Sequence, residues 1–110
     1  MLDRDGKLFY NAKANVFKAL GHPTRLWIVE QLEGGEQCVC ELTESFGVDV
    51  STISKHLTIL KTVGLIEADK RGKQIFYSLK VPCIMKFVHC INDVIKNQAA
   101  ESQQAICNLK

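Results

Sequence analysis

One stretch decides the fold, and it reads STISKHLTILKTVGLIEADKRGKQIFYSL from residue 51 to residue 79. In its first part, Ile53, Leu57 and Leu60 recur at helical spacing and form one apolar face. The other faces carry hydroxyl and basic side chains. Asp49 stands just before this segment, where a carboxylate caps the free amide groups of a first helical turn. We therefore predict an amphipathic helix whose polar face is small and basic.

The second part of this stretch changes to the period of a β-strand. Ile75, Tyr77 and Leu79 alternate with the residues between them in the manner of a strand. Before them, Lys-Arg-Gly-Lys at 70–73 supplies a turn whose glycine is free to take a positive φ. The sequence from 65 to 79 therefore predicts a β-hairpin with a basic tip.

A second helix is predicted just upstream. Apolar residues from about 40 to 46 have helical spacing, and Gly47 ends this helix immediately before the amphipathic one. Two helices joined by so tight a turn form a helix-turn-helix, here about 38–63, and the hairpin at about 65–79 follows it as a wing. The second helix of such a motif lies in the major groove of DNA. The arrangement predicts a DNA-binding protein.

The flanks are helical as well. Apolar spacing predicts helices from about 8 to 20, from Pro23 to the Gly34-Gly35 pair, and from about 82 to 98 with Pro82 in its first turn. The last helix has two adjacent apolar rows, wider than one neighbouring surface usually covers. The rows are Ile84, Val88, Ile91 and Ile95, and Cys83, Phe87, Cys90 and Val94. We expect one row to pack on its own chain and the other on a second copy.

The predicted fold class is mainly α with a small β-hairpin. We expect one winged helix-turn-helix domain over residues 1–110, forming a homodimer through its N- and C-terminal helices. The chain of 110 residues is 46% hydrophobic and 24% charged, which is typical of one folded domain.

The net charge of +2 is unevenly distributed. Residues 30–49 hold six acidic and no basic side chains, whereas residues 50–80 hold six basic and two acidic ones. No apolar run approaches the roughly 18 residues of a membrane helix, and the charged start, MLDRD, is unlike a secretion signal. We expect a cytoplasmic protein with no membrane partner. Its five cysteines, an odd number, are expected to stay reduced.

The sequence does not favour an enzyme. It has no Ser/His/Asp set and no glycine-rich phosphate loop. A catalytic cysteine needs a base and an electropositive setting, but Cys38 and Cys40 lie in the acidic block. The remaining alternative classes are a thiol-rich metal buffer and a protein-interaction module.

The candidate DNA contacts lie in the basic block. Hydroxyl groups and lysines reach base edges and phosphates, and cations at a wing tip reach the backbone or the adjacent minor groove. The predicted contacts are Ser51, Thr52, Ser54, Lys55, His56, Lys61, Lys70, Arg71 and Lys73. For His56, a hydrogen bond within the helix pair is an equal alternative. Two copies on half-sites about 34 Å apart imply double-stranded operator DNA with an imperfect inverted repeat.

Cys38 and Cys40 flank Val39 where the helix-turn-helix begins. In an extended segment, residues two apart point the same way, so both sulfurs can approach one ion. Thiolates select soft ions. An ion bound there pulls on the start of the DNA-binding motif, and the coupling is reciprocal. The alternative is that both cysteines are small buried hydrophobic residues.

These segments resemble the ArsR/SmtB family of winged-helix metal-sensing repressors. The resemblance covers roughly residues 9–95. Its residues are ALGHPTRL at 19–26, CVCEL at 38–42, STISKHLTILK at 51–61, GLI at 64–66 and RGKQIFYSL at 71–79. It implies a dimeric repressor that leaves its operator when an inducer binds, and it places the inducer site at Cys38 and Cys40.

Departures from the family pattern bear on the inducer. Arsenic-sensing relatives often have a third cysteine where this chain has Thr43. Residues 1–21 hold no Cys or His for the extra ligands of cadmium and lead sensors, and the last helix lacks the Asp and His of zinc sensors at the matching positions. We expect trivalent arsenic or antimony, with Cd(II), Pb(II) or Zn(II) as alternatives, and no cofactor required for DNA binding. A third ligand is expected from Cys83, Cys90, Cys107 or a small cellular thiol.

A redox or sulfur sensor of the same fold, using Cys83, Cys90 and Cys107, is the other alternative within the family. Relatives of that kind pair cysteines of the second and last helices, but the second helix here has Val29. Cys83 and Cys90 are seven residues apart, about 10.5 Å along a helix, so they cannot pair within one chain. We expect these two to fill the core and Cys107 to be exposed. His22 and His89 are expected to be structural.

Overall fold

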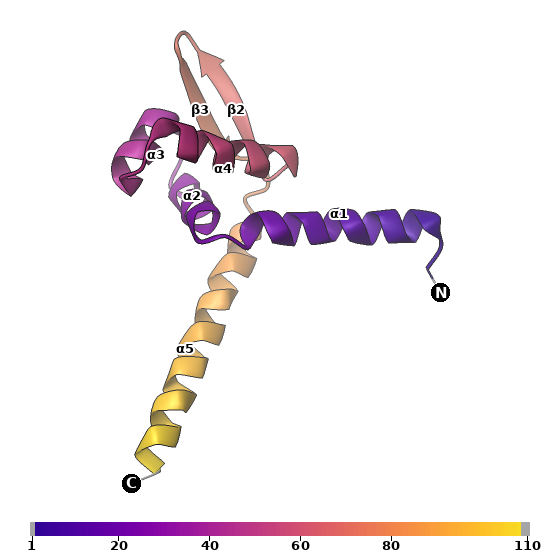
Figure 1. The fold of residues 1–110 in the computed structure, drawn as a ribbon, viewed down its shortest axis with the longest axis vertical. Coiled ribbons are helices and arrows are strands. Elements are labelled where there is room, and N and C mark those ends of the chain that lie inside the picture. The colour runs from indigo at the N-terminus through magenta and orange to yellow at the C-terminus, as the bar shows by residue number, and fades with distance from the viewer. Residues whose placement is uncertain (1, 109–110) are drawn as a thin grey trace.

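A computed structural model describes residues 2–108, with side chains as far as Gln103. This part of the chain forms five helices and a three-stranded antiparallel sheet (Figure 1). The helices are α1 Arg4–Leu20, α2 Pro23–Glu33, α3 Val39–Phe46, α4 Val50–Thr62 and α5 Ile84–Asn108. The strands are β1 Gln37–Cys38, β2 Ile66–Arg71 and β3 Gln74–Leu79. The predicted class, mainly helical with a small sheet, is confirmed.

The helix-turn-helix is formed by α3 and α4, and local signals set its limits. Gly47 ends α3 at φ 84°, a left-handed conformation that glycine adopts without strain. Asp49 caps α4, as predicted, by accepting a hydrogen bond from the Thr52 amide at 2.9 Å. The turn between the two helices is therefore fixed at both ends.

The wing is the β2–β3 hairpin. Its strands pair from Ile66 opposite Leu79 to Arg71 opposite Gln74, which leaves a two-residue turn. Gly72 opens that turn with φ 62°, as the predicted turn chemistry requires.

The third strand, β1, was not predicted. Gln37 pairs with Tyr77, and Cys38 pairs with Phe76. Two residues are too few to show a strand period in the sequence. The pairing matters because it joins the wing to the residues directly before α3.

One apolar core joins α2, α3, α4 and the sheet. Ile28, Leu42, Ile53 and Leu57 have no exposed surface. The outer helices reach this core with one end each. Their buried residues are Ala19 and Leu20 from the end of α1, and Met85 and Val88 from the start of α5.

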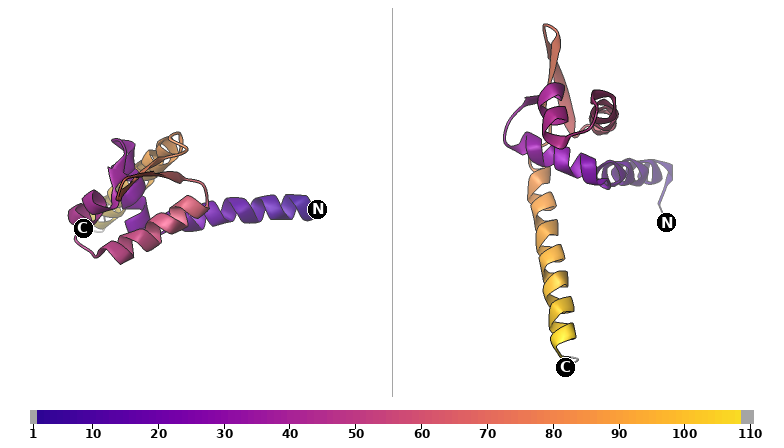
Figure 2. Two further views of the ribbon diagram at one scale, coloured as in Figure 1. Left: turned by 90° about the horizontal axis from the view of Figure 1, so that it is seen from above. Right: turned by 60° about the vertical axis from the view of Figure 1, so that its left-hand side comes forward.

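Most of α1 and α5 extends away from the core, in different directions (Figures 1 and 2). The Cα radius of gyration is 17.7 Å, whereas a compact chain of this length has about 13 Å. The α1 helix begins at Arg4 rather than near residue 8, because the Asp3 carboxylate caps it by accepting from the Gly6 amide at 2.7 Å. The α5 helix begins at Ile84, after Pro82 rather than around it, and continues beyond residue 98.

The expected division of the α5 rows holds only at the start of the helix, where Ile84 and Val88 pack on the core. Val88 is buried, but Ile95 of the same row is 62% exposed, and Val94 of the other row is 63% exposed. The helix leaves the core after its first turns, so both rows are uncovered beyond that point. Cys83 and Cys90 are exposed too, and the prediction that they fill the core is wrong. Among the described helices, no stretch combines the length and apolar character that a membrane-spanning segment needs.

Candidate functional site

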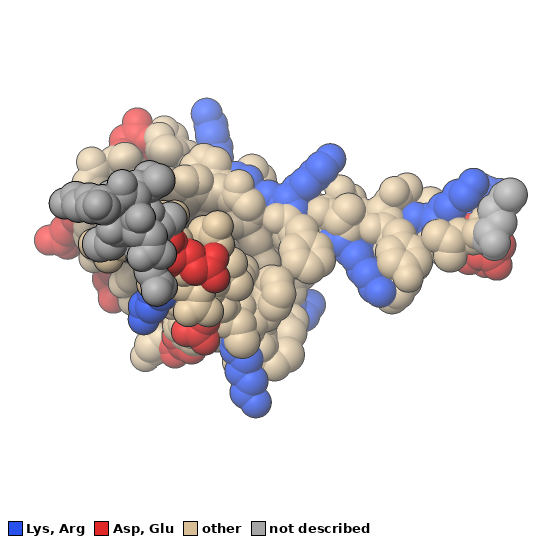
Figure 3. Space-filling model, turned by 90° about the horizontal axis from the view of Figure 1, so that it is seen from below, with Lys and Arg blue, Asp and Glu red and all other residues tan. Residues whose placement is uncertain are grey.

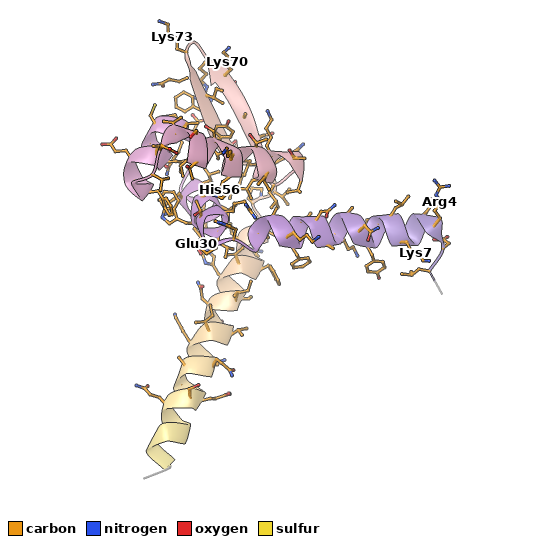
Figure 4. All side chains as sticks on the ribbon, in the orientation of Figure 1. Arg4, Lys7, Glu30, His56, Lys70 and Lys73 are labelled. Carbon is orange, nitrogen blue, oxygen red and sulfur yellow. The ribbon has the colours of Figure 1, made fainter. Side chains whose placement is uncertain are left out.

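The predicted cations lie on α4 and on the wing, which forms the top of the molecule in Figure 1. Lys70 and Lys73 stand at the end of the hairpin and point away from the body (Figure 4). Thr52 and Ser54 are half-buried on α4. The exposed members of the predicted set are Ser51, Lys55, Lys61, Lys70, Arg71 and Lys73. On the opposite side of the molecule, basic side chains are spread along α1 and around the body with acidic ones among them (Figure 3).

His56 faces the junction of α1, α2 and α4 (Figure 4). Its ring centroid lies 4.5 Å from that of His22, and its Nδ1 atom lies 3.2 Å from Nη1 of Arg25. Arg25 also donates to the carbonyl oxygens of Ala19 at 2.5 Å and Lys18 at 3.4 Å, at the end of α1. Because a guanidinium only donates, Nδ1 of His56 accepts. Burial, with the nearby His22 and Arg25, lowers the pKa of His56. His56 therefore makes a structural contact, but its partner Arg25 lies on α2, outside the α3–α4 pair in which the alternative placed the hydrogen bond.

The other two histidines also make contacts within the chain. His22 caps α2, since its Nδ1 accepts from the Thr24 amide at 3.1 Å. His89 Nε2 lies 2.8 Å from a carboxylate oxygen of Glu33, which links α5 to α2. Both contacts agree with the prediction that these histidines are structural.

Arg71 is held against its own molecule. Its Nη atoms meet the two carboxylate oxygens of Glu36 at 2.6 and 2.9 Å, and its Nε donates to Asp69 at 2.9 Å. Its guanidinium carbon lies 4.7 Å from the ring centroid of Phe76. The hydrogen bonds to Glu36 and Asp69 raise the pKa of Arg71 above its ordinary value. Of the predicted wing cations, Lys70 and Lys73 point outward, and Arg71 is turned toward the loop before β1.

Cys38 and Cys40 have different surroundings. Cys38 closes β1, caps α3 and is 5% exposed, whereas Cys40 lies within the first turn of α3 and is exposed. The expectation that one extended segment carries both is wrong, because the helix already begins at Val39. The Glu41 amide lowers the pKa of the Cys38 thiol, but burial and the Glu41 carboxylate outweigh it and leave the pKa raised.

Both cysteines nevertheless line the same cavity, of about 240 Å³. Its other walls come from the start of α3, from α4 and from the wing. They are formed by Val39, Val50, Ser54, Lys73, Gln74 and Ile75. The thiol site thus adjoins both elements that carry the predicted DNA contacts.

The remaining cysteines are not brought to this cavity. Cys83 lies just before α5, and Cys90 lies within that helix. Both are exposed, and neither lines the cavity. Cys107 lies outside the described side chains. Within the described residues, no three His, Cys, Asp or Glu side chains are grouped to hold a metal ion. Cys83 and Cys90 of the same chain therefore do not supply the predicted third ligand.

Known proteins share both the sequence and the fold. The family model described as bacterial regulatory protein, arsR family, matches residues 22–68. An HTH-type transcriptional regulator of Methanocaldococcus jannaschii, MJ1325, is 36% identical over 86 residues, which are 77% of this chain and 97% of that protein. The chain belongs to the ArsR family.

Two further proteins agree with this assignment. The transcriptional repressor SdpR of Bacillus subtilis is 36% identical over 75 residues, covering 68% of this chain and 83% of that one. A homodimeric winged helix-turn-helix DNA-binding domain, Mb0332 of Mycobacterium bovis, matches with a TM-score of 0.75 and 31% identity. The match covers 84% of this chain and 88% of that one. The chain is therefore a transcriptional repressor of the ArsR family, with the winged helix-turn-helix fold.

The sequence did not reveal the partners of His56 and Arg71, two of the residues predicted to contact DNA. Arg25 is 31 residues from His56, and Glu36 is 35 residues from Arg71. Local spacing carries no signal for pairs so far apart. The charge pattern contained a hint, since Glu36 stands in the acidic block and Arg71 in the basic one.

Proposed function

We propose that this protein is a homodimeric repressor that leaves its operator when trivalent arsenic or antimony binds Cys38 and Cys40. The observation that carries the proposal is the shared cavity, whose walls include Ser54 of α4 and Lys73 of the wing. A ligand held by both sulfurs lies against both elements. If it fits only the geometry without DNA, it weakens DNA binding, and DNA weakens its binding equally.

The donor set supports a metalloid over a divalent cation. Two sulfurs without imidazole ligands suit soft ions. Divalent cations require both thiols to lose their protons to solvent, which the raised pKa of Cys38 opposes. Arsenous acid exchanges two hydroxyl groups for two sulfurs, and the thiol protons leave with them as two waters, without a change of oxidation state. A retained hydroxyl group or a small cellular thiol completes the ligand set.

The DNA-binding side of the proposal uses α4 and the wing tip. Ser51, Thr52, Ser54 and Lys55 are the proposed groove contacts on α4, and Lys61 is proposed to meet phosphate. Lys70 and Lys73 are proposed to meet the DNA backbone beside the groove that α4 enters, and their outward direction supports this (Figure 4). Two copies on an inverted repeat double these contacts.

The uncovered helices support the homodimer. Phe17 of α1 and Phe87 of α5 meet edge to face, with ring centroids 5.8 Å apart, yet both remain exposed. An apolar cavity of about 230 Å³ adjoins them, lined also by Leu26 and Ile91. Exposed apolar surface of this kind marks an interaction site, and a second copy that brings the same helices covers it isologously.

The test measures binding of the reduced protein to a fluorescent duplex of its own promoter, with and without arsenite. We expect arsenite to weaken wild-type binding at least tenfold, about 1.4 kcal/mol. Cys38→Ser and Cys40→Ser are expected to bind DNA normally and to ignore arsenite. Serine is itself a good cap at residue 38, so the fold should survive.

The matched control is Cys83→Ser/Cys90→Ser, which should keep the full arsenite response. An arsenite response that persists in both Cys38→Ser and Cys40→Ser would remove the proposed site. A response lost only in the control variant would place the inducer site at Cys83 and Cys90 instead.

A further inference from the structure

We propose that Glu36 takes the place of a DNA phosphate: it keeps Arg71 to itself even when the wing meets DNA, and so limits the affinity of the wing for DNA. This goes beyond the inducer site. It rests on the part of the proposed function that places the wing on DNA, and it does not depend on arsenic.

The geometry is that of anion recognition by arginine. Both Nη atoms of Arg71 engage both carboxylate oxygens of Glu36, at 2.6 and 2.9 Å. Asp69 accepts from Nε at 2.9 Å, and the ring of Phe76 lies under the guanidinium. A planar guanidinium forms the same two-pronged contact with a carboxylate and with a phosphate. A carboxylate in this place therefore competes directly with DNA.

The contact is open to competition because it lies at the surface. The side chains of Arg71 and Glu36 are 49% and 43% exposed. Exposed ion pairs shift an equilibrium by less than about fivefold, and salt screens them. A pair of this strength does not hold the fold together, but it is strong enough to reduce the fraction of free Arg71.

Because of its position, Arg71 would add positive charge to the wing tip when it is released from Glu36. It lies in sequence between Lys70 and the tip residue Lys73, the two cations that point outward (Figure 4). Freed from Glu36, its side chain adds a third cation to the tip. Glu36 lies on the loop that leads into β1, so the wing is restrained by the segment that also carries Cys38.

The experiment compares the salt dependence of DNA binding for Glu36→Gln and the wild type, on the promoter duplex and on an unrelated duplex of equal length. One added phosphate contact in each subunit of the proposed homodimer steepens the slope of log K against log salt by about 0.9 per subunit, or about 1.8 for the dimer. We expect this steepening on both duplexes, with affinity at low salt rising about two- to fivefold. The matched control is Glu67→Gln, which removes one negative charge from exposed β2 about 13 Å along the strand from Arg71. It should leave the slope unchanged.

Two further variants assign the effect to Arg71. Arg71→Gln alone should change the slope little, because the residue is already held, and Glu36→Gln/Arg71→Gln should lose the gain of the single variant. An unchanged slope in Glu36→Gln, or a slope flattened by about 0.9 per subunit in Arg71→Gln alone, overturns the proposal. Lys70→Gln distinguishes failure of the Glu36 proposal from failure of the proposed contact between the wing and DNA. If it flattens the slope while Glu36→Gln does nothing, only the competitor role fails, and if it too does nothing, the wing does not touch DNA.

Discussion

The body of this repressor, from α2 to β3, buries its apolar side chains, whereas the two outer helices, α1 and α5, leave most of theirs exposed. In the body, Ile28, Leu57 and their neighbours have no exposed surface. Along the outer helices, Phe9 is 61% exposed and Val94 is 63% exposed. The body is folded around its own residues, whereas the outer helices carry apolar faces that a single chain leaves in water.

This difference separates what one chain does from what two must do. The body holds the helix-turn-helix, the wing and the thiol cavity, so each copy carries a whole candidate site. In the proposed homodimer, the outer helices set where the second copy lies, and so the spacing of the two α4 helices on DNA. In the proposed mechanism, an inducer held within the body acts on repression by moving one set of DNA contacts relative to the other.

The largest expected effect lies in the body. Leu57→Ala on α4 should lower the free energy of unfolding by about 2–5 kcal/mol, because it leaves a cavity in a fully buried site. Ile59, on the same helix and 41% exposed, is the matched control, and Ile59→Ala should cost less than about 1 kcal/mol. Urea titration at one protein concentration measures both. Similar losses for the two variants would show that Leu57 does not belong to the buried core described above.

An intermediate effect is expected on the outer helices. Val94→Lys puts a charge on the uncovered face of α5 and should weaken self-association at least about tenfold, since an unpaired charge is costly to bury. Sedimentation equilibrium measures this, and urea unfolding of the monomer should stay near the wild type. Asn92→Lys, on another side of the same exposed helix, is the control. Equal association of both variants would show that this face is not covered by a second copy.

The same contrast explains what the sequence could predict of the fold. Ile53, Leu57 and Leu60 repeat at helical spacing because they face one core, and that period alone placed α4. Val88 and Ile95 have the same period but different fates, since period does not say whether a face meets its own chain or another. The two-residue β1 has no period to detect, and its partner lies far along the chain.

The candidate site was predictable to the same extent. Residue chemistry indicated Cys38 and Cys40 as a pair, and the structure places both on one cavity. Their unequal burial depended on where α3 begins, which sequence sets only to within a few residues. The ion pair of Arg71 with Glu36 and the inward direction of His56 toward Arg25 depend on residues far away in the sequence. These are properties of the folded chain that no local pattern contains.

The smallest expected effect lies at the junction of body and outer helix, where Arg25 joins His56 of α4 to the end of α1. The folded pKa of His56 is below its ordinary value of about 6.5. Between these two values the unfolded chain binds more protons than the folded one, so stability rises with pH there. The contribution of neutral His56 is complete above about pH 6.5 and is lost as the pH falls through the lower value.

Urea unfolding of the wild type and of His56→Gln, measured from about pH 7 down to pH 5, tests this contribution. The wild type should lose stability more steeply, because a protonated ring no longer accepts from Arg25 at Nδ1. Subtracting the two profiles removes the other titrating groups, which both proteins share. Parallel profiles would mean that His56 is not held by Arg25 in solution, and that α4 and α1 are coupled only through the apolar core.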